Sequence, residues 1–200
     1  MASRFGLVLS VVLSATVLLA VGSQPTQACL IGKYFRPITV DPNLVLDGVD
    51  FTAMPSFTNS DPQINFPAGS DFYPGGSTEL AFAAEWTGLI DIAVPGFYKF
   101  FTTSDDASRL YIGGILLVDN NFYQGMTERS SAPIDLNAGL HDFRVTYFQQ
   151  GGDRGCIASW LPPGGTEEVI PIDVLACPEP ATLALLALGG LAAILRRRGR

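Results

Sequence analysis

Residues 96–120 read GFYKFFTTSDDASRLYIGGILLVDN, and this stretch decides the fold. Aromatic, β-branched and aliphatic residues are concentrated, as is typical of β-strands, in three short segments: 97–103, 109–112 and 115–119. Gly113-Gly114 separates the last two segments, and glycine tolerates the positive φ that a tight hairpin requires. The stretch therefore predicts three strands of an antiparallel sheet, with the acidic pair Asp105-Asp106 between the first and the second.

Segments of the same kind occur on both sides of this stretch. We expect further strands at 80–86, 89–94, 140–148 and 156–161. Leu110 and Ile112 would share one face of their strand, because side chains alternate between the two faces, and such an apolar face needs a partner sheet. Residues 41–77 are dense in Pro, Gly, Asp and Ser and favour loops with brief strands. The predicted fold class is all-β, an antiparallel β-sandwich or barrel.

The N-terminus has the layout of a secretory signal peptide. Arg4 precedes the apolar run 5–21, and Thr26-Gln27-Ala28 offers small residues at a cleavage site. A lipoprotein signal normally has an aliphatic residue where Thr26 stands, so lipidation of Cys29 is the less favoured alternative. We predict a signal helix within residues 1–28, followed by one β domain at 29–177, since about 150 residues are the size of one ordinary domain.

The C-terminal tail, residues 178–200, has three parts. Pro178-Glu179-Pro180 comes first, the uncharged run 181–195 follows, and the chain ends in RRRGR. As a helix, the apolar run would reach only about 22 Å against a hydrocarbon core of about 30 Å, so it predicts a short transmembrane helix of marginal length. The arginines favour the cytoplasmic side, which leaves the β domain outside the inner membrane.

This tail resembles the PEP-CTERM sorting signal of Gram-negative bacteria. The resemblance implies recognition by an exosortase-type membrane protease, which removes the tail and passes the protein to the cell surface or the extracellular matrix. Residues 181–195 would then hold the chain in the inner membrane only before processing. An ordinary single-pass membrane anchor is the alternative.

The β domain is strongly acidic. From Cys29 to Cys177 there are 7 Lys and Arg against 18 Asp and Glu, which gives a net charge of 7 − 18 = −11. A surface of this sign repels phosphate backbones, so nucleic acid is a poor candidate partner. Cations and neutral polar molecules are better candidate ligands.

Three cysteines in an oxidising compartment predict one disulfide and one remaining thiol. Cys29 and Cys177 bracket the β domain, and a bond between them would close a loop of about 150 residues. Cys156 is the alternative partner for either of them. The sequence leaves this choice open.

Six short motifs follow one another along the chain in a recognisable order. SDDASRLYIGG at 104–114 is followed by VDN at 118–120 and LNAGLH at 136–141, and it is preceded by IGKYF at 31–35, FAAEWTG at 82–88 and PGFYKF at 95–100. Together and in this order, they resemble the anthrax protective antigen domain family, a β-barrel module also found in fungal flocculins, epithelial adhesins and some glycosidases. The resemblance covers most of the chain after residue 28. Ala107 and Gly113 depart from it, since Gly and Asp are more usual there.

Asp105 and Asp106 are the candidate binding residues. Adjacent acids in a loop that ends a strand supply oxygen ligands for a hard cation such as calcium. The resemblance implies that the matching aspartates of the lectin branch flank a cis peptide and hold a calcium ion that also contacts sugar hydroxyls. Asp153, in the loop 149–155, is the candidate third metal ligand, although the adhesins have an Asn there. The alternative is that the aspartates only cap backbone N–H groups of the loop.

The function expected from these features is that of an exported, lectin-like or adhesin-like protein that binds glycans or exopolysaccharide, with calcium as its candidate cofactor. The alternative is a structural or protein-interaction module of the envelope or the exopolysaccharide matrix. We expect no enzymatic activity, because family members within enzymes usually accompany a separate catalytic domain. The single histidine, His141, also has no second His or paired Cys for a zinc cluster and no obvious catalytic triad.

Overall fold

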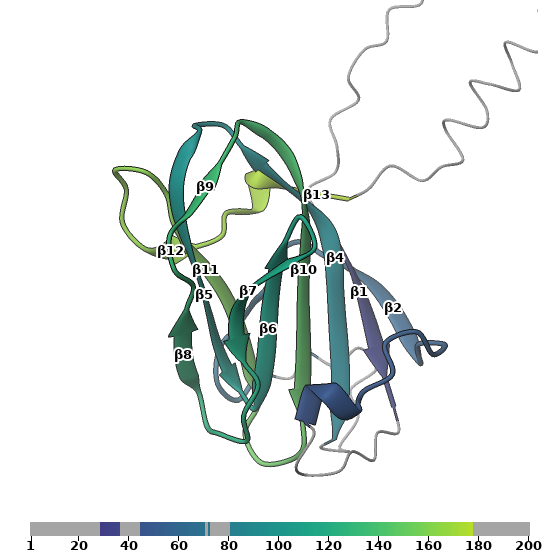
Figure 1. The fold of residues 1–200 in the computed structure, drawn as a ribbon. Helices are drawn as coiled ribbons and strands as arrows, with labels where there is room; N and C mark the ends of the chain where they lie inside the picture. The colour runs from purple at the N-terminus through teal and green to yellow at the C-terminus, as the bar shows by residue number, and fades with distance from the viewer. Residues whose placement is uncertain (1–28, 37–44, 71, 73–80, 178–200) are drawn as a thin grey trace, which may run out of the picture.

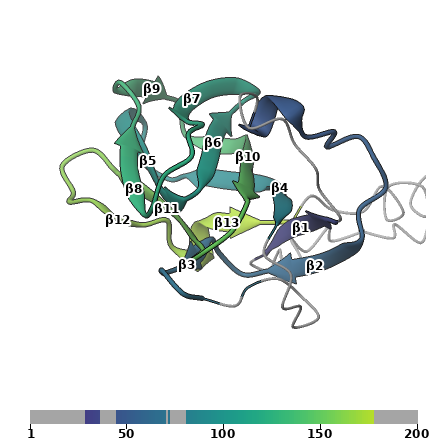
Figure 2. The same ribbon diagram turned by 90° about the horizontal axis from the view of Figure 1, so that it is seen from below.

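The computed structural model describes residues 29–36, 45–70, 72 and 81–177. These residues form two antiparallel β-sheets packed face to face, which Figure 1 shows from the side and Figure 2 from below. The seven-stranded sheet has the order β2 (Phe57–Asp61), β1 (Leu30–Phe35), β4 (Phe82–Ile92), β10 (Gly139–Gln149), β6 (Ala107–Ile112) and β7 (Ile115–Asn120), with β13 (Leu175–Ala176) beside β4. The six-stranded sheet has the order β12 (Glu168–Val169), β11 (Gly155–Leu161), β5 (Gly96–Asp105) and β8 (Thr127–Ser130), with β3 (Asn65–Phe66) beside β11 and β9 (Ile134–Leu136) beside β5.

This architecture confirms the predicted all-β sandwich. Two short 3-10 turns, η1 (Val45–Gly48) and η2 (Ile172–Val174), are the other regular elements of the described chain. The longest pairing joins β10 to β4 from Gly139↔Ile92 to Gln149↔Phe82. The core lies between the sheets, and Leu110 and Ile112, predicted to share one face, are both buried in it.

β4 corrects one prediction of the sequence. Residues 80–86 and 89–94 were expected to form two strands with a break at Thr87-Gly88, but β4 runs through this point without interruption. The glycine is there for space and not for a turn. A Cβ at Gly88 would lie 2.6 Å from Leu30 Cδ2 and 2.8 Å from the carbonyl oxygen of Ala176, so only glycine lets β1 and β13 approach this closely.

A buried carboxylate is built into the core beside β1. Asp61 is 6% exposed, and its Oδ2 accepts hydrogen bonds from the Tyr34 hydroxyl at 2.6 Å and from Trp86 Nε1 at 2.9 Å. Asn59 Nδ2 donates to Oδ1 at 2.8 Å. Burial and the neighbouring Asp61 charge raise the pKa of Tyr34 far above its ordinary value. With donors on both oxygens, this carboxylate is a satisfied structural group.

A second, smaller apolar cluster covers the outer face of the seven-stranded sheet. Val45 and Leu46 of η1 pack there against the sheet residues Phe35, Ala83, Ala107 and Phe148. Backbone φ is +44° at Val45, an uncommon value for a β-branched residue. η1 is thereby fixed close to the point where β10 ends and β6 begins.

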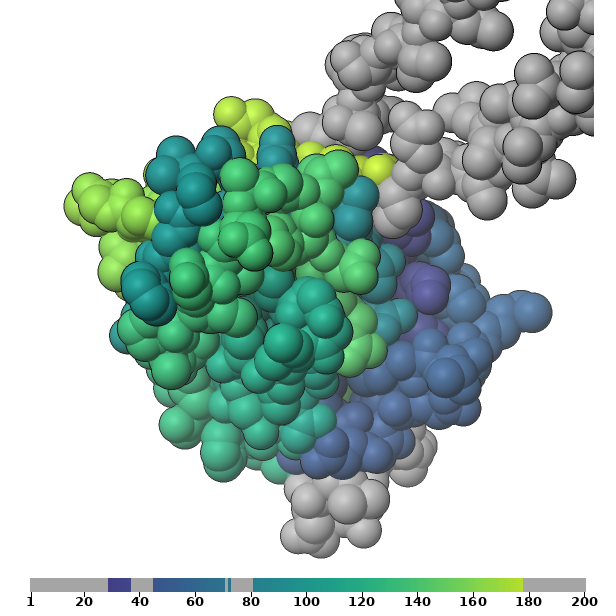
Figure 3. Space-filling model, turned by 45° about the horizontal axis from the view of Figure 1, so that its top comes forward, coloured from purple at the N-terminus to yellow at the C-terminus, as the bar shows by residue number. Residues whose placement is uncertain are grey.

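The ends of the described chain are joined covalently. Cys29 and Cys177 form a disulfide with a Cα–Cα distance of 5.2 Å, and Cys156 is a free, buried thiol whose pKa burial raises. Figure 3 brings this end of the molecule forward, with the yellow C-terminal residues upon it. Asp105, the last residue of β5, lies at the opposite end of the sandwich (Figure 1).

The predicted terminal helices lie elsewhere in the chain. The signal helix within 1–28 and the short transmembrane helix at 181–195 both fall outside the described residues. Within the described ranges, no helix has the length and apolar character needed to cross a membrane.

Replacing both Cys29 and Cys177 with serine should lower the free energy of unfolding by about 5 kcal/mol, because a loop of 148 residues is opened in the unfolded chain. Urea unfolding of the variant and of the unchanged protein measures the difference. Cys156→Ala is the matched control, since it keeps the disulfide and should lose much less. Equal urea midpoints for the double variant and the unchanged protein would contradict the pairing.

Candidate functional site

The candidate site lies where β5 ends and β6 begins, at the end of the sandwich away from the disulfide. Asp105 closes β5, Asp106 follows it through a cis peptide bond, and Ala107 opens β6. Two loops meet this junction: residues 121–126 between β7 and β8, and residues 150–154 between β10 and β11. The structure therefore brings the loop of Asp153 next to the predicted pair.

Asp106 ties these two loops together. Its Oδ1 accepts a long hydrogen bond of 3.4 Å from the backbone N–H of Gln124, and its Oδ2 accepts one of 2.8 Å from the backbone N–H of Gln150. Burial raises the pKa of Asp106, and the two hydrogen bonds oppose that change. The capping role weighed from the sequence thus holds for Asp106.

Asp105 is in a different situation. Its backbone carbonyl accepts a hydrogen bond from the Tyr147 hydroxyl, but no group among the described residues donates to its carboxylate. Burial, followed by the negative charges of Asp106 and Asp153, raises the pKa of Asp105 to about 6. This carboxylate is held close to other acids without a compensating partner.

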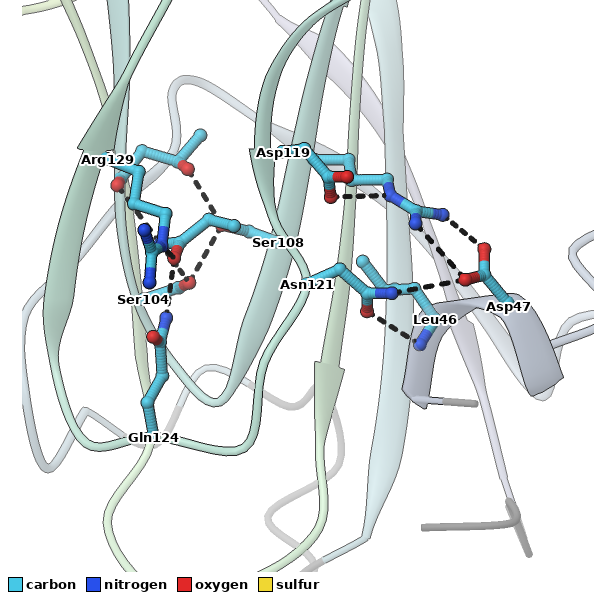
Figure 4. A network of polar contacts seen from close by, with 11 residues as sticks. Leu46, Asp47, Ser104, Ser108, Asp119, Asn121, Gln124 and Arg129 are labelled. Carbon is cyan, nitrogen blue, oxygen red and sulfur yellow. Dashed lines mark hydrogen bonds and ion pairs between the residues drawn. The ribbon is translucent and has the colours of Figure 1, made fainter. Parts of the chain in front are cut away.

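A polar network beneath the pair fixes the 121–126 loop (Figure 4). Ser104 Oγ donates to the carbonyl of Asp106 at 2.9 Å and lies 2.7 Å from Ser108 Oγ. Asn120 Nδ2 donates to Ser104 Oγ at 3.2 Å, and Gln124 Nε2 donates to Asn120 Oδ1 at 2.6 Å. Because Asn120 is fully buried, the loop is held from inside the sandwich.

The outer side of the same loop is fixed as well. Asn121 Oδ1 accepts the backbone N–H of Leu46 at 2.9 Å, and Asn121 Nδ2 donates to Asp47 at 3.3 Å (Figure 4). Asp47 in turn forms an ion pair with Arg109 of β6. The 121–126 loop is therefore connected to both faces of the seven-stranded sheet.

Gln149 fixes the 150–154 loop in the same way, through hydrogen bonds from a buried side chain. It is fully buried at the end of β10, and its Nε2 donates to the carbonyls of Gly151 at 2.9 Å and Asp153 at 2.8 Å. Its Oε1 lies 3.0 Å from the Tyr147 hydroxyl, which also contacts the carbonyl of Asp105. The side chain of Asp153 is exposed in this loop and near enough to act on the charge of Asp105.

A pocket of about 340 Å³ opens beside Asp106. Its described walls are Asp106, Tyr123, Gln150 and Gly151. Sequence reasoning missed Tyr123, Gln124 and Gln149. A polar Gln149 on the inward alternation of Val145 and Tyr147 was the one signal that could have indicated a buried hydrogen-bonding role.

The donor chemistry of this end fits a hard cation. Calcium prefers carboxylate and carbonyl oxygens. Burial first, and then the charges of Asp106 and Asp153, disfavour the ionised form of Asp105, and a bound cation would oppose this effect. No three His, Cys, Asp or Glu side chains in the described ranges stand close enough to hold a metal by themselves. Backbone or ligand oxygens would have to complete the six to eight that calcium takes.

This chain matches the models of two protein families. Residues 32–173 match the PA14 domain, which is 173 − 32 + 1 = 142 of the 200 residues. Residues 176–198 match the PEP-CTERM protein-sorting motif. Both resemblances drawn from the sequence, to the protective antigen domain and to the sorting signal, are thereby confirmed.

Individual proteins agree with this. Anti-sigma-I factor RsgI3 of Acetivibrio thermocellus is 32% identical over 116 residues, which are 58% of this chain and 18% of that protein. The PA14 sugar-binding domain from an RTX adhesin is 18% identical with a TM-score of 0.60, covering 75% of this chain and 98% of that one. The Epithelial Adhesin 9 A domain of Candida glabrata, solved in complex with Galβ1-4GlcNAc, is 14% identical with a TM-score of 0.60, covering 76% and 90%. The two structures share the fold, and the chain spans under a fifth of the anti-sigma-I factor.

The raised pKa of Asp105 predicts how stability depends on pH without metal. Between its ordinary pKa of 3.8 and about 6, folded Asp105 binds a proton that the unfolded chain does not, so this contribution to stability is lost as pH rises through 6. Asp105→Asn removes the loss. At pH 7.5 in chelator it should unfold a few degrees higher, equivalent to about 1 kcal/mol, which is less than the shift alone implies because solvent screens the site.

Thermal unfolding at pH 7.5 and pH 4.5 measures this difference, which should fall to about a third at pH 4.5, because folded Asp105 is protonated there while the unfolded chain is still mostly ionised. The matched control is Asp135→Asn, an exposed aspartate of β9 that should change neither midpoint. A lower melting temperature for Asp105→Asn at both pH values would show that the carboxylate contributes structural hydrogen bonds instead.

Proposed function

The chain belongs to the PA14 domain family, and on that premise we propose that it is a non-enzymatic carbohydrate-binding protein of the lectin or adhesin type. Asp105 and Asp106 are the residues that bind the sugar. The observation that carries the proposal is the buried Asp105 carboxylate, which receives no hydrogen bond from any described residue. A buried polar group without a partner is costly, so such a group in a strand-end loop points to an external ligand.

Calcium is the proposed cofactor, held by Asp105, Asp106 and Asp153. When bound, the ion supplies positive charge and open coordination positions for sugar hydroxyls. The protein's part is to hold the three carboxylates in place, through Asp106 on its two loops and Gln149 beneath the loop of Asp153. The arrangement of the loops supports this role, since Asp106 and the loop of Asp153 meet beside Asp105. The three side chains do not form a metal cluster by themselves, so backbone or ligand oxygens would complete the coordination.

The PEP-CTERM motif supports export and sorting to the cell surface. We propose a signal peptide at 1–28, a β domain at 29–177 and a sorting segment at 178–200, with residues 181–195 anchoring the chain in the inner membrane until an exosortase-type protease acts. The protein then reaches the cell surface or the extracellular matrix. The motif match starts at Ala176, which pairs with Leu89 in the sheet. Because the last described strand ends at Ala176 and the disulfide at Cys177, a cut beyond Cys177 would remove no part of the described sheets.

A second candidate function is a structural module of the envelope or the exopolysaccharide matrix. Asp106 favours it, because both of its oxygens already accept backbone N–H groups, as in a purely structural cap. The two functions differ in what they ask of Asp105. Only the lectin requires its carboxylate.

A glycan array run once with calcium and once with chelator tests the proposal. The protein should bind defined glycans with calcium, and both chelator and Asp105→Asn should remove this binding by at least about tenfold, because the ion loses a charged ligand. Asp135 lies on β9, far from the site, so the Asp135→Asn variant should bind as the unchanged protein does.

Three outcomes would contradict parts of this proposal. Binding that survives both the chelator and Asp105→Asn would place the sugar site elsewhere. If a folded sample binds no glycan on the array, the structural module is favoured. Hydrolysis of an aryl glycoside by the protein would overturn the non-enzymatic assignment.

A further inference from the structure

The end of the sandwich that carries the Cys29–Cys177 bond, here called the disulfide end, has features of a membrane-contacting surface. We propose that, while the tail is in place, the β domain docks through this end on a zwitterionic phospholipid surface, with exposed apolar side chains in the headgroup layer. The inference rests on the proposed anchoring of residues 181–195 in the inner membrane. Docking in this orientation turns Asp105-Asp106, at the opposite end, away from the bilayer.

The linker between the β domain and the apolar run is short. It consists of the three residues Pro178-Glu179-Pro180. From Cys177 to Ala181 there are four peptide steps, which span about 14 Å when fully extended. The headgroup layer alone is about 5–8 Å thick. Because the disulfide fixes Cys177 to the domain, the disulfide end is held at the membrane surface for as long as the apolar run is inserted.

The tip of the disulfide end extends beyond the point where the tail leaves. Ala176 pairs with Leu89, and β4 continues for three more residues to Ile92, opposite Gly139 of β10. Three strand residues rise about 10 Å, so a linker of about 14 Å has little length left once it has passed the tip. The β4–β5 and β9–β10 turns, which Figure 1 shows above β13, therefore lie in the headgroup layer when the strands stand on the membrane.

Exposed apolar side chains are concentrated at this end. Of the ten large apolar side chains that are exposed in the described part of the chain, six lie in its turns and strand starts: Val94, Phe97, Ile115, Leu116, Leu140 and Ile172. Val94, Phe97 and Leu140, at 58%, 66% and 59%, belong to the two turns at the tip or to the residues beside them. Single exposed apolar residues are normal, but such a group at the tethered end indicates an apolar partner.

The charges at this end determine which lipid fits. Four exposed acids stand among the apolar side chains: Asp91, Asp135, Asp142 and Asp173. Asp91 lies opposite Leu140 in the sheet, and Asp135 lies opposite Phe97. An anionic bilayer repels these carboxylates, whereas a zwitterionic headgroup offers an ammonium group to them. Weak contacts are enough for docking, because the short linker gives the domain a high effective concentration at the surface.

Tryptophan quenching by brominated phosphatidylcholine tests the docking. The sample is the exported precursor with its tail, residues 29–200, in vesicles of phosphatidylethanolamine and phosphatidylcholine. Phe97→Trp places a reporter on the disulfide end, and Phe57→Trp, at another exposed phenylalanine, is the matched control on β2. The unchanged protein, in which Trp86 and Trp160 are buried, gives the background. Quenching should be at least about twice as strong at position 97 as at 57, because only position 97 reaches the lipid.

A second set of variants separates docking from tethering alone. In the Phe97→Trp chain, Val94→Asp together with Leu140→Asp should lower the quenching at least about twofold, because charges replace the apolar contacts. Met54→Asp, at a side chain that is 92% exposed next to β2, should leave the quenching unchanged. Vesicles made mostly of phosphatidylglycerol should also lower it, because the acids of this end are repelled.

Flotation of the vesicles in a density gradient distinguishes the failure of anchoring from the failure of docking. If the precursor does not float with the vesicles, the proposed anchoring fails and this inference fails with it. If it floats, three results would leave the anchoring intact and overturn only the docking: equal quenching at positions 97 and 57, full quenching in the Val94→Asp, Leu140→Asp variant, or equal quenching in phosphatidylglycerol.

Discussion

The whole site end depends on one buried carboxylate. Asp106 is 8% exposed and accepts backbone N–H groups from two loops that lie far apart in the sequence, residues 121–126 and 150–154. A buried carboxylate is costly unless it is hydrogen-bonded, so both loops are drawn to this point. Asn120 and Gln149 then secure each loop from below. Apart from Asp106 itself, the described walls of the pocket belong to these two loops.

Two buried acids of this chain, Asp61 and Asp105, differ in their hydrogen-bond partners. Asp61 lies in the core with donors on both oxygens, as a structural carboxylate must. Asp105 is about as buried, but no described group donates a hydrogen bond to its carboxylate, and the charges of Asp106 and Asp153 act on it. The two acids therefore differ in their partners and not in their burial, and this difference is the reason why a binding role is proposed for Asp105.

Much of this could be predicted from the sequence, and the limits have physical causes. Alternation of apolar residues predicted the sandwich, and Asp105-Asp106 stood out because two acids end a strand. Gly88 was mistaken for a break, because a glycine that makes room for β1 and β13 looks in sequence like one that makes a turn. Tyr123, Gln124 and Gln149 gain their roles only from contacts across the fold, and the cysteine pairing depends on where the chain ends meet.

β13, which immediately precedes Cys177 of the disulfide, lies at one end of the sandwich, and β5 ends at the other (Figure 1), so the domain has a mechanical axis between the disulfide and Asp105-Asp106. A pull between these ends runs along the strands, while the hydrogen bonds of the β4–β10 ladder lie across that direction. All eleven residue pairs of the ladder then resist in shear together and do not open one after another. The Cys29–Cys177 bond passes part of the load to β1, so that β13, only two residues long, does not bear the tension alone.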